Sequence, residues 1–166
     1  LVMMCGSMGC GPMHGLTLKL AKELKENELL TVVCGTNRQL YRRLRVRCEG
    51  NPRVRILSYV KDVAGLLDSA DLYLTKPGGI SVTEAAEKRL PMILIDTVAG
   101  CEDYNLQFFV GLGAAKSAEA GQQTCALCLS VLRDDNALRE MSDAYRNRQA
   151  ANGANYICDI LQNGVG

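Results

Sequence analysis

Short apolar runs alternate with helical patterns along most of this chain. The runs "LVMMC", "LLTVVC", "VRILSY", "DLYLT" and "MILID" have the length of buried strands, and a helical pattern follows each of them. Strands that are apolar on both faces and linked by helices predict a parallel sheet with helices on both faces. The expected fold class is therefore α/β and Rossmann-like.

The expected helices cover residues 14–25, 37–48, 61–69, a stretch from 81 onward, and 102–111. "GAAKS" is expected to add a short sixth strand, and two or three helices should cover 118–162. Ligands of such sheets bind beyond the carboxyl ends of the strands. Function is thus expected in the loops after Cys5, Cys34, Tyr59, Thr75 and Asp96.

Length and composition indicate one ordinary globular domain. The chain has 166 residues, of which 48% are hydrophobic and 22% charged, with a net charge of +1. The near-neutral charge, the 5% aromatic content and the absence of Trp argue against nucleic-acid binding. No apolar stretch approaches the roughly 18 to 20 residues that cross a bilayer.

Cysteine usage indicates reduced thiols. The chain has eight cysteines, and an even number could form disulfides in a secreted protein. An α/β core needs no such cross-links, so we expect free thiols and a cytoplasmic location. Cys125 and Cys128 have the spacing of zinc ligands, but no second close pair accompanies them, and the only His is His14. Core thiols are the favoured interpretation, and no metal site is expected.

The first candidate loop is "GSMGCGP", Gly6 to Pro12. A Walker loop would need Lys and Ser or Thr after Gly11, where Pro12 and Met13 stand. The dinucleotide fingerprint needs G-x-G-x-x-G and an acid near the end of the second strand, and both are missing. Two interpretations stay open: a tight turn, or a loop that closely approaches a phosphate or sugar.

The second candidate segment is "KPGGISVTE", between an expected strand and a helix. Pro and Gly favour a tight turn without bulky side chains, which leaves backbone N–H groups open to an anion at the helix start. Ser81-Val82-Thr83-Glu84 fits a capping box, in which Ser81 and Glu84 close the first helical turn. Alternatively, Glu84 accepts two ribose hydroxyls while the helix start holds a diphosphate and Lys76 adds positive charge.

Two further segments carry charge. "DTVAGCEDYN" places Glu102 and Asn105 at a helix start, where acids are favoured by the helix dipole or could bind sugar hydroxyls. The helix "NRQLYRRLRVRC" carries five arginines. A solvated basic face is the favoured interpretation there, and attraction to an anionic bilayer surface is the alternative.

Together these segments resemble the C-terminal, donor-binding domain of GT-B glycosyltransferases. The similar branch contains the diacylglycerol glucosyl- and galactosyltransferases and the peptidoglycan N-acetylglucosaminyl transferase. The resemblance covers nearly all of the chain, and its most specific stretch is "YVKDVAGLLDSADLYLTKPGGISVTEAAEKRLPMILIDTVAGCEDYN". Where that branch usually has Pro-Gly-Gln-Glu, this chain has Ala99-Gly100-Cys101-Glu102. The Gln that would touch the sugar is Cys101, which leaves the sugar open.

The resemblance implies a role for each matching residue. The diphosphate would face a glycine loop and a helix start, uracil would meet the backbone of the "YVKDV" stretch, and acids and amides would hold ribose and donor sugar. In that order, the implied donor-binding residues are Gly6, Ser7 and Gly9; Lys76, Gly78, Gly79 and Ile80; Val60; Glu84; and Glu102 and Asn105.

The implied activity is inverting transfer of a hexose from a UDP-sugar to a lipid such as diacylglycerol, without metal or cofactor. The family's general base and acceptor site lie in an N-terminal domain, which is absent from residues 1–166, so no catalytic residue is expected in this chain. A membrane surface is an expected partner, and nucleic acid is not. The alternatives are a separate subunit of a two-chain transferase and a non-enzymatic nucleotide-binding module.

Overall fold

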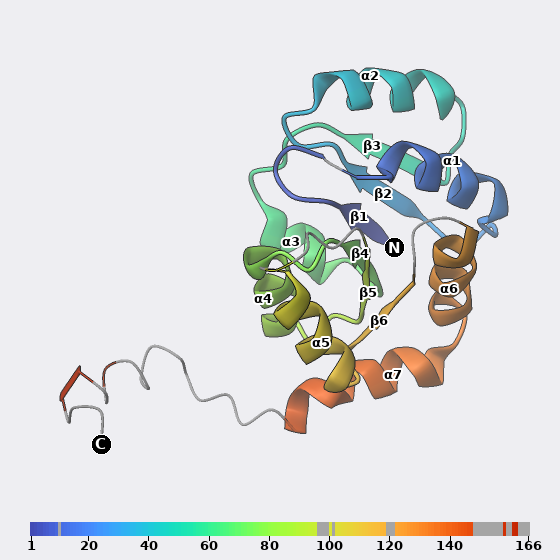
Figure 1. The fold of residues 1–166 in the computed structure, drawn as a ribbon. Coiled ribbons are helices and arrows are strands. Elements are labelled where there is room, and N and C mark those ends of the chain that lie inside the picture. Colours follow the sequence, from blue (N-terminus) through green and yellow to red (C-terminus); the bar gives the residue numbers. More distant parts are fainter. Residues whose placement is uncertain are drawn as a thin grey trace.

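A computed structural model describes residues 1–9, 11–95, 100, 102–118, 122–147, 158 and 161–162. Within these ranges six strands form one parallel sheet (Figure 1). The strands are β1 (Val2–Met4), β2 (Leu30–Val33), β3 (Val54–Leu57), β4 (Tyr73–Thr75), β5 (Met92–Leu94) and β6 (Ala115–Ser117). Their order across the sheet is β3-β2-β1-β4-β5-β6, so the predicted Rossmann-like fold is confirmed.

Helices cover both faces of this sheet. They are α1 (Met13–Glu23), α2 (Arg38–Arg47), α3 (Val63–Asp68), α4 (Gly79–Glu87), α5 (Asp103–Gly111), α6 (Gln122–Leu132) and α7 (Asp135–Ala144), followed by the short 3-10 turn η1 (Tyr145–Asn147). Most of these bounds fall within one or two residues of the predicted ones. The helix expected from Ser81 instead begins at Gly79, and this difference changes the interpretation of the site.

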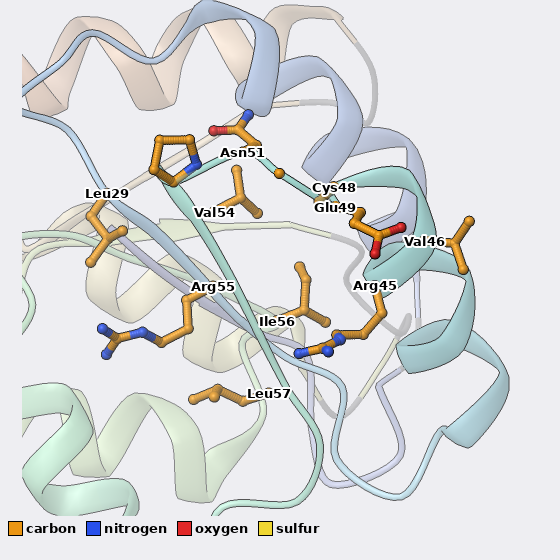
Figure 2. A pocket seen from close by; sticks show the side chains of 12 residues that line it. Leu29, Arg45, Val46, Cys48, Glu49, Asn51, Val54, Arg55, Ile56 and Leu57 are labelled. Carbon is orange, nitrogen blue, oxygen red and sulfur yellow. The ribbon is translucent and has the colours of Figure 1, made fainter.

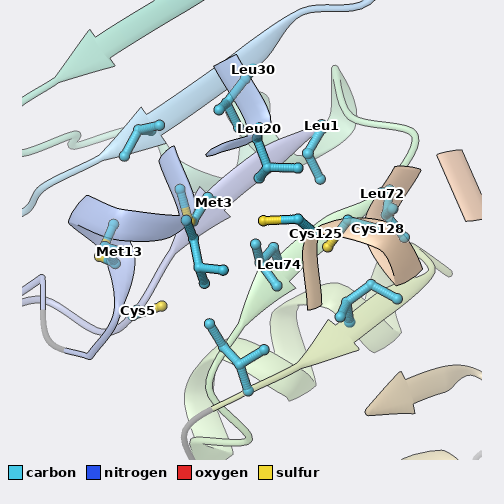
Figure 3. Packing of buried hydrophobic residues seen from close by; sticks show 14 of the residues in the cluster. Leu1, Met3, Cys5, Met13, Leu20, Leu30, Leu72, Leu74, Cys125 and Cys128 are labelled. Carbon is cyan, nitrogen blue, oxygen red and sulfur yellow. The ribbon is translucent and has the colours of Figure 1, made fainter. Parts of the chain in front are cut away.

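Two apolar clusters lie on opposite faces of the sheet. In one, Leu20 of α1 and Cys128 of α6 pack with Met3, Leu30 and Leu74 of the strands (Figure 3). The other joins α3, α4 and α5 to the opposite face. All of these strand side chains are nearly inaccessible to water, which explains the apolar runs without polar alternation.

The paired thiols of α6 belong to the first cluster. Burial raises the pKa of the Cys128 thiol to about 12, so it stays protonated in the core near neutral pH. Cys125 is also buried, and Cys5, Cys34, Cys48 and Cys158 are free thiols as well. Cys10 and Cys101 lie outside the described residues. Over the described ranges, no three His, Cys, Asp or Glu side chains gather closely enough to hold a metal ion.

Candidate functional site

The strand order reverses between β1 and β4. The chain continues from β1 toward β2 on one side and from β4 toward β5 on the other, and such a switch point opens a crevice at the carboxyl ends of the two strands. A cleft of about 380 Å³ lies there, within the size range of small-molecule sites. Seven predicted residues line this cleft: Gly6, Ser7, Val60, Gly78, Gly79, Ile80 and Glu84.

The floor of the cleft is fixed by bonds between β1 and β4. The Thr75 hydroxyl donates to the Met4 carbonyl at 2.7 Å, and the Tyr73 hydroxyl lies 3.5 Å from the same oxygen. Burial raises the pKa of the Tyr73 hydroxyl to about 12, so it remains a neutral group at physiological pH. These contacts hold the two strand ends, and hence the two loops that follow them, in register.

The start of α4 corrects the capping-box prediction. Gly78 is the N-cap, with φ −69° and ψ 137°, and as a glycine it supplies no side-chain cap. Ser81 is therefore the third helical residue and cannot be the N-cap that a capping box requires. The local Ser-x-x-Glu pattern was misleading because the N-cap of the helix lies at Gly78, before Ser81 in the chain. Glu84 instead lies in the second turn, exposed, and lines the cleft.

The fold itself does not require glycine at the start of α4. Among the described residues, a Cβ at Gly79 would meet nothing within 4 Å, and a Cβ at Gly78 would meet only Glu102 Oε1, at an ordinary 3.7 Å. Gly78 has an extended backbone and Gly79 a helical one, which other L residues adopt freely. The two glycines keep the first N–H groups of α4 clear of side chains on the side that faces the cleft.

The glycines after β1 and β2 have a different environment. A Cβ at Gly35 would stand 2.0 Å from the Ser7 carbonyl oxygen, and one at Gly9 would stand 2.4 Å from the Cys34 oxygen. The Thr36 N–H donates to the Ser7 carbonyl at 2.8 Å, which joins the same two loops. Gly9 does not line the cleft. Its role in the described structure is to let the loops pack together.

The other predicted residues lie beside the cleft. Asn105 donates from Nδ2 to the Pro77 carbonyl at 2.9 Å, so the first turn of α5 holds the Lys-Pro-Gly-Gly turn in place. The sequence did not suggest this structural contact. Glu102 approaches Gly78 from the same side, and Lys76 is half-buried just before the turn. The predicted loop residues 96–99 and Cys101 lie outside the described part of the chain.

Six lining residues were not predicted. They are Met4, Val33, Gly35, Tyr59, Val63 and Ser81. Tyr59 is 62% exposed and Ile80 78% exposed, so the cleft mouth presents two large apolar side chains to solvent. Each of the six lies at a strand's carboxyl end or at the start of the following helix, and that position was the available signal in the sequence.

A larger groove of about 620 Å³ lies along the outer edge of β3 (Figure 2). The C-terminal half of α2 and the α2–β3 turn form its other wall. It follows the side of an edge strand, whereas ligands of parallel sheets bind beyond the strand ends. We therefore assign the candidate substrate site to the smaller cleft, because its position and its two open helix-start glycines suit a phosphate.

Comparison with known families now places the chain. The model described as "Glycosyl transferases group 1" matches residues 14–148. The chain belongs to this glycosyltransferase family. It is 34% identical over 157 residues to the processive diacylglycerol beta-glucosyltransferase of Bacillus subtilis (strain 168). The aligned region covers 90% of this chain and 41% of that protein. The predicted family is thereby confirmed, and the chain spans less than half the length of such relatives.

Solved structures confirm the fold. MurG of Acinetobacter baumannii superposes with a TM-score of 0.81 at 20% identity, over 97% of this chain and 48% of that one. A co-structure of S. aureus MnaA with UDP gives a TM-score of 0.69 at 15% identity, over 97% and 45% of the respective chains. The predicted half of a GT-B architecture is confirmed by the match to MurG.

Proposed function

We propose that this chain is the donor-binding half of an inverting, UDP-sugar-dependent glycosyltransferase whose acceptor is a lipid such as diacylglycerol. The observation that carries the proposal is the start of α4. Within the described part of the chain, Gly78 and Gly79 have no steric or conformational reason to be glycine, and they lie in one cleft with Glu84. A phosphate group that contacts the backbone N–H groups would explain both glycines, because a side chain at either position would obstruct it.

The donor would lie across the cleft. The diphosphate occupies the space between the Gly6–Ser7 turn and the start of α4, where backbone N–H groups and the helix dipole attract negative charge. Glu84, one turn further along, accepts the two ribose hydroxyls. Uracil lies toward Val60, between the exposed side chains of Tyr59 and Ile80.

Transfer requires that charge on the departing diphosphate be stabilised. The N–H groups of α4, its dipole and Lys76 supply fixed positive charge, so the proposed reaction uses no metal or cofactor. The acceptor hydroxyl needs a general base and attacks the anomeric carbon from the side opposite the diphosphate. We place that base and the acceptor site in a preceding domain, so residues 1–166 alone bind donor without transferring it.

The names of similar proteins support the two substrate classes. The relative from Bacillus subtilis is named a diacylglycerol glucosyltransferase, which supports a lipid acceptor, and the similar MnaA structure contains UDP, which supports a uridine nucleotide donor. A separate catalytic subunit would share this site and differ only in receiving its acceptor domain from another chain. A nucleotide-binding module would bind UDP in the same way and never join an acceptor domain.

Calorimetric titration with UDP, ADP and GDP tests the donor site. We expect UDP to bind most tightly and its affinity to be unchanged by EDTA, because no metal bridges the diphosphate in the proposed site. Equal affinity for all three nucleotides would refute the uridine assignment. Loss of UDP binding in EDTA would refute the metal-free site.

A further inference from the structure

The outward face of α2 carries a cluster of positive charge. This ten-residue helix contains five arginines and no acidic residue, and all five are exposed: Arg38, Arg42, Arg43, Arg45 and Arg47. Its apolar side chains, Leu40 and Leu44, are buried against the sheet. The helix therefore packs into the core along one stripe and presents all five arginines to solvent.

This charge is local. The chain has 19 basic and 18 acidic residues, so the sequence outside α2 holds 14 basic residues against those 18 acids and is net negative. Within the described part of the chain, none of the five arginines forms a salt bridge, whereas Lys88, Arg133 and Arg146 do. Arg45 lies over the ring of Tyr41, with 5.9 Å from its guanidinium carbon to the ring centroid. The positive charge of α2 is thus not neutralised by carboxylates of the fold.

The groove along β3 continues this surface. Arg45 of α2 and Arg55 of β3 both line it, together with the apolar side chains of Val54 and Ile56 (Figure 2). Val46, between two arginines, is 72% exposed. Glu49 is the acidic residue in this lining, and the arginines outnumber it.

We propose that the arginine face of α2 and the adjoining β3 groove bind the anionic phospholipid headgroups of a bilayer surface. This proposal rests on the proposed function, since a lipid acceptor is reached at a membrane. Clustered arginines on one helix are attracted to anionic lipid, and phosphate is the group that their planar guanidinium groups bind best. The apolar stripe of α2 is already buried, so the contact is peripheral and electrostatic rather than an insertion. The exposed apolar side chain of Val46, between two arginines, favours a bilayer surface over a nucleic-acid backbone.

Sedimentation with vesicles tests this contact. The chain is expected to bind phosphatidylglycerol vesicles and not phosphatidylcholine vesicles, and added salt should release it. The triple variant Arg42→Gln, Arg43→Gln, Arg47→Gln removes three charges from α2 and leaves the cleft lining intact. Its vesicle affinity should fall on the order of a hundredfold, from about fivefold per arginine.

A matched control removes the same charge elsewhere. Lys22 and Lys25, near the end of α1, and Lys116 in β6 are exposed, and changing all three to Gln should leave vesicle binding within about twofold of wild type, since these side chains lie outside the arginine face. Equal losses in the two triple variants would reduce the effect to net charge and overturn the proposal.

Two other results would also overturn it. One is unchanged vesicle binding by the α2 variant. The other is binding of a single-stranded RNA probe, measured by fluorescence anisotropy, without binding to phosphatidylglycerol vesicles. UDP calorimetry on every variant separates this proposal from the donor site: the α2 variant should bind UDP like wild type. A wild-type chain that binds anionic vesicles and no UDP would refute the donor site and leave the membrane contact standing.

Discussion

Two regions around the cleft, the paired loops after β1 and β2 and the start of α4, contain glycine for different reasons. In the loops after β1 and β2, Gly9 and Gly35 have positive φ and almost touch the backbone of the facing loop. At the start of α4, Gly78 and Gly79 have ordinary backbone angles and open space around them. The first pair is required by packing within the chain. The packing of the described residues does not require glycine at the second pair, which points to a ligand.

The comparison separates residues that build the site from residues that would use it. A substitution in the loops after β1 and β2 should destabilise the protein, whereas one at the start of α4 should weaken nucleotide binding without destabilising the fold.

Gly35→Ala should lower the free energy of unfolding by about 3 to 5 kcal/mol. The added Cβ would lie 2.0 Å from the Ser7 carbonyl oxygen, and the φ of +59° is strained for alanine. Urea denaturation followed by circular dichroism measures the change.

Gly50→Ala is the matched control for this change. Gly50 has a φ of +76° but nothing within 4 Å of its added Cβ, so only the backbone strain of about 1 kcal/mol should appear. Similar losses in the two variants would mean that the contact between the loops contributes little, and the distinction between the two turns would fail.

Glu84→Gln should weaken UDP binding by about 1.5 to 3 kcal/mol, because hydrogen bonds to a carboxylate are stronger than those to an amide. Stability should stay within about 0.5 kcal/mol, since Glu84 is exposed and caps no helix. Calorimetry with UDP and with 2′,3′-dideoxy-UDP measures both sides of the effect. The dideoxy ligand lacks the ribose hydroxyls and should bind wild type and variant alike.

Glu87→Gln provides the control on the same helix, since Glu87 is exposed at the end of α4 and does not line the cleft. It should leave UDP affinity unchanged. If both glutamine variants lose the same affinity, the effect comes from the charge of α4 as a whole, and Glu84 is no ribose ligand.

Gly79→Ala should move stability and binding in opposite directions. Alanine in a helical position with free space stabilises by about 0.4 to 1 kcal/mol, while its methyl group would separate the phosphate from the α4 N–H groups and weaken UDP binding by about 1 kcal/mol, the scale of one hydrogen bond. Thermal unfolding and UDP calorimetry on one preparation show both changes.

The control for that substitution is Gly111→Ala. Gly111 ends α5, and a Cβ there would also meet nothing within 4 Å. It should gain similar stability and bind UDP normally. A Gly79→Ala protein that binds UDP as tightly as wild type would remove the main support for a phosphate at α4.

Much of the site's location could be predicted from the sequence. Parallel strands place their carboxyl ends at one edge, so Gly6, Val60 and Glu84 could be assigned to one cleft before any coordinates were known. Their roles toward UDP stay predictions. Asn105 was expected to reach a sugar, yet it also holds Pro77 across 28 positions of sequence, a contact that no local pattern indicates.

Local sequence patterns were enough to predict the strands, the helices and the parallel sheet, because apolar periodicity depends on near neighbours along the chain. The tertiary structure decided where α4 begins and which glycines the fold needs. Ser81 and Glu84 match a capping box locally, but the path of the chain out of β4, held by Asn105, starts the helix at Gly79. The close contact of Gly9 with Cys34 and of Gly35 with Ser7 exists only because β1 and β2 are neighbours in the sheet. Strand order brings distant segments together, and their steric demands appear only then.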